Sequence, residues 1–380
     1  MRILFLTNHL EGTDGWSKVS WDLIEQVIEP VHDEDYEILA LVNRYHERGK
    51  LEKDQQKVLL PDPLKLLANP FLIFPTARKI NSEIAKFSPD VIHFMVEPYA
   101  LCLPFLKTSE IKTFLTVHGT YSVLPILLKF SPQKVILSYL SKKYYQKLDG
   151  IVAVSNYTKR YLLKYYSKLK EKVRVITNGI NFDQLFENPK SKDQVKKTIL
   201  FVGQVKKRKG LLEAIEALKY YRDNLSNNLI FDFNIVGSYI KNDEYYRKLV
   251  YKLKEYKLGD ENSFKGRVGG KDLHAYYRNA DLLLMTSLSN HYFEGFGLVF
   301  LEANTKGTPV IGSRNSGCED AILDEQTGYL VDPHNPKEVA EKIYMVLNRN
   351  TIQAENCIEW AKQNDIKIKT KELLNFYHGR

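Results

Sequence analysis

Short apolar runs recur along the whole chain, separated by longer stretches in which apolar residues return every three or four positions. The short runs are typical of strands buried on both faces, and the longer spacing is typical of amphipathic helices. We expect a first strand at residues 3–7, a glycine-containing loop, a helix from about Lys18 and a second strand at residues 36–42. Strand, helix and strand in this order form a βαβ unit, which predicts a parallel sheet.

The alternation occurs as two series on either side of a polar stretch without a period, residues 177–197, which is typical of a linker. The further strands of the first series are expected at residues 90–94, 113–118, 149–155 and 173–176. Those of the second series are expected at residues 198–203, 231–237, 263–264, 281–285, 309–312 and 328–331. Each series predicts one doubly wound α/β domain, in which ligands bind beyond the carboxyl ends of the strands. We therefore expect a site in the cleft between the two domains.

The composition is that of an ordinary globular protein, with 44% hydrophobic and 27% charged residues among 380. No apolar run approaches the roughly 18 residues that cross a bilayer, and the N-terminus resembles a buried strand rather than a signal peptide. Three widely spaced cysteines, Cys102, Cys318 and Cys357, favour a reducing compartment and no metal cluster. A cytoplasmic location is expected.

The net charge of +9 is unevenly distributed. Residues 112–174 hold 13 Lys or Arg against only Asp149 and Glu171, whereas residues 1–111 are net acidic. Such a surplus suits phosphates, a membrane surface or nucleic acid. Lysines and aromatic residues interleave in residues 124–130 and 139–145, which favours lipid headgroups, although a solvated lysine-rich face gives the same pattern. No nucleic-acid motif accompanies it, so we expect no nucleic-acid partner.

The richest chemistry lies in residues 290–307. Glu294 and Glu302 flank the sequence Gly295-Phe296-Gly297 and an apolar run from Leu298. Glycines free backbone N–H groups, and a helix beginning directly after them suits an anion or a sugar hydroxyl. Glu302 would lie about one turn into that helix, where it can point back toward the loop. The pattern predicts a polar ligand site at the point where a strand gives way to a helix.

These residues resemble the retaining GT-B glycosyltransferases of family 4. Residues 294–303 are similar to the E-x7-E signature of that family, and Lys306-Gly307-Thr308-Pro309 follows as it does there. Other similar segments are Asn178-Gly179-Ile180, Gly203 with Lys209-Gly210, Tyr277-Arg278-Asn279-Ala280-Asp281, and Gln326-Thr327-Gly328-Tyr329-Leu330-Val331. The resemblance implies two Rossmann-like domains facing across a cleft. Residues 1–180 would bind the acceptor and residues 181–360 the donor, and residues 361–380 would form a helix that crosses back.

The resemblance also assigns roles to single residues. Glu302 would bind the ribose hydroxyls of the donor nucleotide, and Glu294 would position the donor sugar. Lys209 would neutralise the departing diphosphate, and His118, at a strand end, would contact the sugar. Backbone amides of Gly295, Phe296, Gly297 and Leu298 would make the remaining donor contacts. Neither carboxylate is expected to be the general base, because in such enzymes the leaving phosphate takes that role.

Four further positions of the first and second domains complete the expected donor site. Gly15 lies in the first glycine loop, and Gly203 begins the loop that faces the phosphates. Where the family commonly has arginine, this chain has Gln204. Either Arg208, Lys206 or Lys207 would supply the missing charge, or phosphate binding would rest more on Lys209. Val268 would lie where backbone groups contact the base. A second strand-end histidine, His93, is expected to be structural.

The resemblance therefore implies a retaining hexosyltransferase that uses a nucleotide-diphosphate sugar, with a UDP-sugar favoured over GDP-mannose. The acceptor would be a glycan or a lipid-linked intermediate at the cytoplasmic membrane face. Since no Asp-x-Asp element occupies a suitable loop, we expect neither a metal nor another cofactor. The alternatives are a catalytically silent GT-B subunit that binds a glycan or a partner, and a sugar-phosphate synthase on the same fold.

Overall fold

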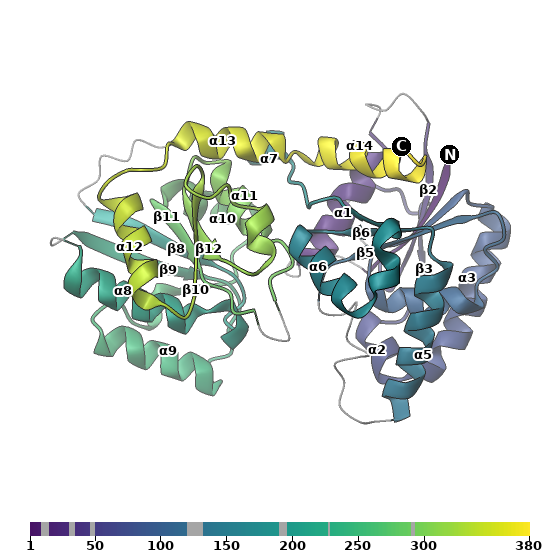
Figure 1. Cartoon of the computed structure of the whole chain (residues 1–380), viewed down its shortest axis with the longest axis horizontal. Helices are drawn as coiled ribbons and strands as arrows, with labels where there is room; N and C mark the ends of the chain where they lie inside the picture. The colour runs from purple at the N-terminus through teal and green to yellow at the C-terminus, as the bar shows by residue number, and fades with distance from the viewer. Residues whose placement is uncertain are drawn as a thin grey trace. The chain divides into compact units, whose positions relative to one another are not determined.

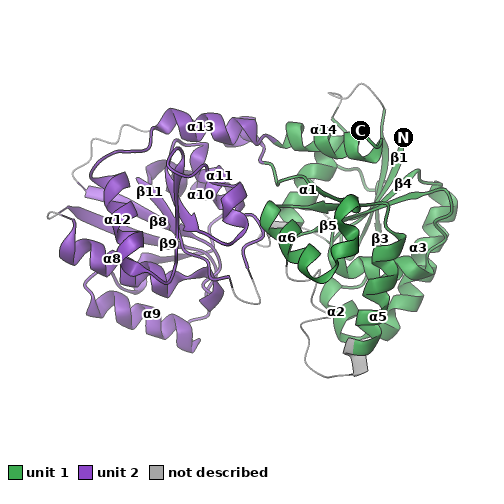
Figure 2. Ribbon diagram, viewed as in Figure 1, with its two compact units in different colours: residues 1–179, 366–380 green, residues 180–365 purple. Residues whose placement is uncertain are grey.

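The computed structural model describes residues 1–8, 15–29, 35–45, 50–119, 132–189, 196–226, 229–289 and 293–380. The chain forms two compact units, one from Met1–Gly179 with Ile366–Arg380 and one from Ile180–Asp365 (Figure 2). The chain therefore returns to unit 1 at Ile366, whereas the sequence predicted that it returns at residue 361.

Unit 1 is built on a parallel sheet of seven strands in the order β3-β2-β1-β4-β5-β6-β7. The strands are β1 Arg2–Leu6, β2 Glu37–Val42, β3 Gln56–Val58, β4 Val91–Phe94, β5 Lys112–Val117, β6 Gly150–Ala153 and β7 Val173–Val175. In the centre of the sheet, Ile3 pairs with Ile38 on one side and with Val91 on the other. Nearly every residue of the central strands is buried, which accounts for their continuous apolar runs.

Helices cover both faces of this sheet (Figure 1). They are α1 Gly15–Val27, α2 Pro63–Ala68, η1 Pro70–Leu72, α3 Ile73–Phe87, η2 Glu97–Phe105, α5 Pro132–Lys147, α6 Asn156–Tyr165, η4 Ser167–Lys172 and α14 Ile366–Tyr377. The C-terminal helix α14 packs against α1, and its Tyr377 hydroxyl contacts Nδ1 of the buried His93. Nε2 of His93 lies 2.8 Å from the Thr116 hydroxyl, so both ring nitrogens hold structural contacts.

Unit 2 contains a parallel sheet of six strands in the order β10-β9-β8-β11-β12-β13. The strands are β8 Lys196–Val202, β9 Ile230–Val236, β10 Phe264–Gly266, β11 Leu282–Met285, β12 Val310–Ser313 and β13 Gly328–Val331. The helices are α7 Phe182–Leu185, η5 Lys207–Lys209, α8 Leu211–Asn224, α9 Glu244–Glu255, η6 Glu261–Ser263, α10 Gly270–Asn279, α11 Leu298–Asn304, η7 Gly317–Asp320, α12 Pro336–Leu347 and α13 Ala354–Gln363. Both units are therefore doubly wound α/β folds, as the alternation of strands and helices predicts.

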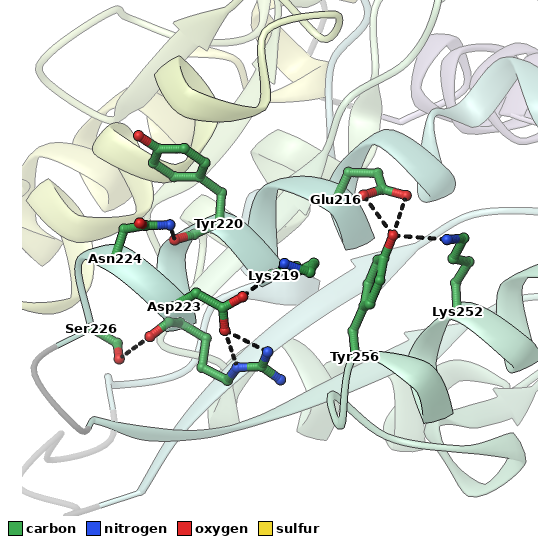
Figure 3. A network of polar contacts seen from close by, with 9 residues as sticks. Glu216, Lys219, Tyr220, Asp223, Asn224, Ser226, Lys252 and Tyr256 are labelled. Carbon is green, nitrogen blue, oxygen red and sulfur yellow. Dashed lines mark hydrogen bonds and ion pairs between the residues drawn. The ribbon is translucent and has the colours of Figure 1, made fainter.

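Figure 3 shows a network of polar contacts between α8 and the C-terminal end of α9. The Tyr256 hydroxyl donates to the Glu216 carboxylate at 3.0 Å and accepts from Lys252 Nζ at 2.9 Å. These part-buried hydrogen bonds fasten the end of α9 to α8.

The structure corrects two details of the sequence interpretation. The edge strand β3 was not predicted, and the expected linker at 177–197 contains the short helix α7 and the first residues of β8. Asn181 caps α7 through a 3.1 Å bond from Gln184 N–H to its side-chain oxygen, which explains a helix in so polar a stretch. Within the described residues, no helix combines the length and the hydropathy that a bilayer crossing requires.

Candidate functional site

The loop that carries Glu294 is fixed by its glycines. Gly297, the N-cap of α11, has φ +91°, and a Cβ there would lie 2.7 Å from ring carbons of Phe300. Gly317 donates its N–H to the Glu294 carbonyl at 2.8 Å, and a Cβ on Gly317 would overlap the carbonyl of Gly295. Only glycine fits either place, because one needs a left-handed backbone and the other a close backbone approach. The main chain of Glu294 is therefore held before any ligand arrives.

The Glu294 side chain forms an ion pair with Lys209. Its Oε2 contacts Lys209 Nζ, and Arg208 Nη1 lies 4.0 Å away. The side chains of Glu294 and Lys209 are only 15% and 13% exposed, whereas Arg208 is 41% exposed. Burial opposes ionisation of Glu294, but the charges of Lys209 and then Arg208 outweigh it and lower its pKa. Glu294 is therefore a carboxylate compensated by a mostly buried ammonium.

Lys209 is presented by a turn that joins two strand-end loops. Gly210, with φ +67°, ends η5, and its carbonyl accepts the Thr286 hydroxyl at 2.7 Å. The Leu288 N–H donates to the Arg208 carbonyl at 2.8 Å. These bonds tie the loop after β8 to the loop after β11. Lys209 and Glu294, 85 residues apart in the sequence, consequently meet at the carboxyl edge of the sheet.

The second carboxylate has a different partner. Glu302, on α11, is 9% exposed and accepts a 2.7 Å hydrogen bond from the buried Tyr277 hydroxyl of α10. Burial, then the charge of Glu302, raises the pKa of Tyr277 well above its usual value, so the phenol keeps its proton. Thr308 holds this end of α10 through a 2.9 Å bond to the Tyr277 carbonyl. The sequence marked Tyr277 only as part of a motif and did not indicate this bond.

The other predicted donor positions occupy strand ends of unit 2. The Gly203 N–H donates to the Val236 carbonyl at 2.9 Å, and a Cβ on Gly237 would overlap the Gly203 carbonyl. Gln204 is exposed in the following loop, and Val268 is half-buried between β10 and α10. Gly295, Phe296 and Leu298 belong to the loop and first turn described above. The structure thus groups Lys209, Arg208 and Glu294 in one cluster. Glu302 lies outside it, on the helix α11 that follows the loop of Glu294.

In unit 1, His118 follows β5 and is held from two sides. Its backbone N–H donates to Glu97 Oε1 at 2.7 Å, and Nε2 lies 2.9 Å from the Met95 carbonyl. A carbonyl only accepts, so Nε2 carries a proton and donates it to the Met95 carbonyl. Burial raises the pKa of Glu97, and the nearby His118 opposes that effect. Glu97 is a residue that sequence reasoning missed, because buried carboxylates are rare.

The remaining predictions concern Gly15, His93 and segments outside the described residues. Gly15 is the first residue of α1, and two residues later the Ser17 hydroxyl accepts from the Asn8 amide at 2.7 Å. Burial lowers the pKa of His93 to about 3, so this histidine stays neutral in the core. Residues 124–130 and 290–292 lie outside the described residues. Among those that are described, no group of three or more His, Cys, Asp or Glu could hold a metal ion.

Two parallel sheets in this order, with a lysine–carboxylate pair at the carboxyl edge of the second, define an α/β protein of the GT-B class. Residues 32–184 match the family model Glycosyltransferase Family 4, and residues 183–364 match Glycosyl transferases group 1. The chain belongs to glycosyltransferase family 4.

Several curated proteins are similar in sequence. An uncharacterized 41.2 kDa protein in the cps region of Klebsiella pneumoniae is 28% identical over 260 residues, which are 64% of each chain. A D-inositol 3-phosphate glycosyltransferase of Streptomyces avermitilis is 30% identical over 50% of this chain and 43% of its own. An uncharacterized glycosyltransferase of Methanocaldococcus jannaschii is 26% identical over 90% of this chain and 88% of its own. The chain thus spans less than two thirds of the first two relatives.

Solved structures share the fold over the whole chain. A sucrose-phosphate synthase from Thermosynechococcus elongatus has a TM-score of 0.76 at 19% identity, covering 100% of this chain and 98% of its own. The Anabaena protein HepE in complex with UDP has a TM-score of 0.76 at 18% identity, covering 100% of both chains. These similarities confirm the predicted α/β class of two Rossmann-like domains.

Proposed function

We propose that this chain is a retaining glycosyltransferase that moves a hexosyl unit from a nucleotide-diphosphate sugar, preferably a UDP-sugar, to a glycan or lipid-linked acceptor. The observation that carries the proposal is the different pairing of the two carboxylates on the loop and helix 293–304. Glu294 is compensated by Lys209, whereas Glu302 accepts a hydrogen bond from the neutral phenol of Tyr277. HepE structures with UDP and with UDP-glucose support the choice of donor by analogy of fold.

Each residue of the proposed donor site in unit 2 has a role that suits its surroundings. Glu302, on α11, would accept from the two ribose hydroxyls of the donor, and such charge-assisted bonds are strong. Lys209 and Arg208 lie where a diphosphate leaving group would be neutralised. Glu294 orients hydroxyls of the donor sugar and stabilises positive charge that develops at its anomeric carbon. The bond between the anomeric carbon and the diphosphate breaks, and the acceptor oxygen bonds that carbon on the same face, which preserves the anomeric configuration. The leaving diphosphate takes the proton of the acceptor hydroxyl.

In unit 1, His118 contacts the donor sugar. The contact between its Nε2 and the Met95 carbonyl holds the imidazole ring in place for that role. We infer that unit 1 binds the acceptor and that Gly15 brings a backbone amide to the site. The lysine and arginine side chains and the backbone amides of residues 295–298 carry the diphosphate charge, so the reaction proceeds without a divalent metal. Activity that persists in excess chelator supports this step, and activity that requires added Mg²⁺ or Mn²⁺ contradicts it.

The basic segment 112–174 supports an acceptor at the cytoplasmic membrane face. Within it, α5 exposes Val135, Ile136 and Tyr139 beside Lys142 and Lys143, a combination that suits an interfacial helix. Lys143 Nζ lies 5.5 Å from the ring centroid of Tyr139. We propose a peripheral association of this segment with anionic headgroups, which presents a lipid-linked acceptor to unit 1.

Two substitutions test the donor site. Glu302→Ala should weaken nucleotide binding, while Glu294→Ala should chiefly lower turnover with bound donor. Nucleotide affinity is measured by calorimetry, and turnover by release of the nucleoside diphosphate. Glu341→Ala, which removes an exposed carboxylate from α12 of the same unit, is the matched control. If both site variants turned over donor like the parent, the assignment would fail.

A further inference from the structure

Exposed apolar side chains gather in two segments of unit 1. In residues 63–74, Phe71 is 79% exposed, Phe74 59% and Leu64 51%. In α5, Val135 is 71% exposed and Tyr139 60%. Full burial of one such side chain is worth about 1.5–3 kcal/mol, so leaving several in water is costly without a partner.

The fold brings these two segments onto one surface. The turn η1, which carries Phe71, contacts α5, and α2, α3 and α5 all pack on η2. The ring of Phe74 lies 4.6 Å, centroid to centroid, from that of Phe105 at the end of η2. We call residues 63–79 together with α5 the apolar ridge. In the sequence its two parts are separated by the strands β4 and β5 and by η2, so the ridge exists only in the folded unit (Figure 1).

The turn that carries Phe71 is held in place by hydrogen bonds that cap the two short helices α2 and η1. Asp62 caps α2 by accepting from Leu64 N–H at 2.9 Å, and Asn69 accepts from Phe71 N–H at 3.2 Å. Pro70 begins η1 and is buried beneath the turn. Phe71 is therefore held outward by caps on both short helices, which lowers the entropy lost when a partner covers it.

The charge on the ridge is of one sign. Residues 63–82 contain Lys65, Arg78 and Lys79 and no Asp or Glu, and residues 132–148 contain only lysines among charged residues. Lys65, Arg78, Lys79, Lys142 and Lys143 are exposed. Lysine is depleted at protein–protein interfaces, whereas lysines that border exposed aromatic and aliphatic side chains suit the headgroup region of an anionic bilayer.

We propose that the apolar ridge docks on an anionic lipid bilayer, with Leu64, Phe71 and Phe74 inserted among the acyl chains and the five cations among the headgroups. This inference rests on the proposed function in that it locates the membrane contact of the enzyme. It differs in placing the inserted side chains on α2, η1 and α3, outside the basic segment 112–174.

The test is flotation of the full chain with phosphatidylcholine vesicles prepared with and without phosphatidylglycerol. We expect the parent to float with the anionic vesicles, and Phe71→Ser with Phe74→Ser to weaken the partition at least tenfold. Ile240→Ser removes an equally exposed side chain (71%) from unit 2 and should leave binding unchanged. Lys142→Glu with Lys143→Glu should weaken binding about fivefold or more and reduce its dependence on anionic lipid.

Two outcomes would overturn the inference. One is that the parent does not float with anionic vesicles, or that the variant with Phe71→Ser and Phe74→Ser floats with them as well as the parent does. The other is a concentration-dependent dimer of the parent that the same variant abolishes, since the ridge would then join two copies of the chain. Donor hydrolysis in the absence of lipid tests the proposed function separately, and we expect the Phe71 and Phe74 variant to retain it.

Discussion

Replacing Glu294 by glutamine should tighten the binding of a diphosphate while it slows transfer. In the ligand-free protein, Lys209 is engaged by Glu294, so an incoming diphosphate must compete with a carboxylate for the same ammonium. Glutamine keeps an oxygen that accepts a hydrogen bond but removes the negative charge. It also removes the repulsion between Glu294 and the phosphates. Both changes act in the same direction on affinity.

The size of the effect follows from the burial of the pair. Exposed ion pairs contribute about 0.2–1 kcal/mol, and hydrogen bonds to charged groups in less exposed places about 1.5–3 kcal/mol. With side chains 13% and 15% exposed, this pair lies near the lower end of the second range, about 1.5 kcal/mol. Glu294→Gln should therefore lower the Kd for UDP and for inorganic diphosphate about tenfold. Turnover should fall about 100-fold, the scale seen when one stabilising group is removed from a transition state.

Calorimetric titration with inorganic diphosphate, UDP and UDP-glucose separates the two effects. Lys209→Met is the companion variant, and it should weaken the binding of all three ligands, because the cation itself is lost. An unchanged or higher Kd for diphosphate in Glu294→Gln would refute the reasoning, since it would mean that the pair does not compete with the ligand.

Three further predictions concern the support of the site. Tyr277→Phe removes the 2.7 Å bond to Glu302 and should lower the free energy of unfolding by about 1.5–3 kcal/mol and weaken UDP binding, both measurable by calorimetry. Gly210→Ala would place a Cβ against the Thr286 carbonyl at φ +67°, so the thermal midpoint should drop by several degrees, whereas Ala at the open, exposed Gly269 should leave it unchanged. Burial lowers the pKa of His93 to about 3 in the folded protein, against about 6.5 in the unfolded chain, so the parent should lose up to about 1.4 kcal/mol of stability per pH unit as the pH falls from the second value to the first. In His93→Gln, denaturant titrations at several pH values should show that one-proton slope removed.

The sequence predicted the buried strands well, because a strand covered on both faces must be apolar throughout. It failed at β3, where Gln56-Lys57-Val58 forms a partly exposed edge strand without that pattern. It also started the returning helix at residue 361, whereas α13 runs to Gln363 and the returning helix, α14, begins at Ile366. Edge strands and helix breaks depend on tertiary contacts that a local period does not record.

In the site, too, the residues that stand close together in the sequence were predicted, and those that depend on distant partners were not. Glu294, Glu302 and the glycines between them stand together in one recognisable stretch of sequence. Tyr277 and Glu97 could not be assigned in this way, because each acts through a partner more than 20 residues away on another element. Their signals were weak as well. A tyrosine in an amphipathic helix is usually core, and a glutamate before a proline usually lies in solvent.

The local charge balance explains how Gln204 can stand where the family commonly has arginine. Glu294 and Lys209 neutralise one another, and Arg208, at 4.0 Å from Glu294, leaves the cluster with one unbalanced positive charge. Arg208 is 41% exposed, so its guanidinium can turn toward a ligand at little cost in desolvation. In the proposed function, phosphates that engage Lys209 would remove the compensating ammonium from Glu294, and this carboxylate would then be available to the sugar hydroxyls. Arg208 would supply the cation that an arginine at 204 would provide, and the diphosphate would itself prepare Glu294 for the attached sugar.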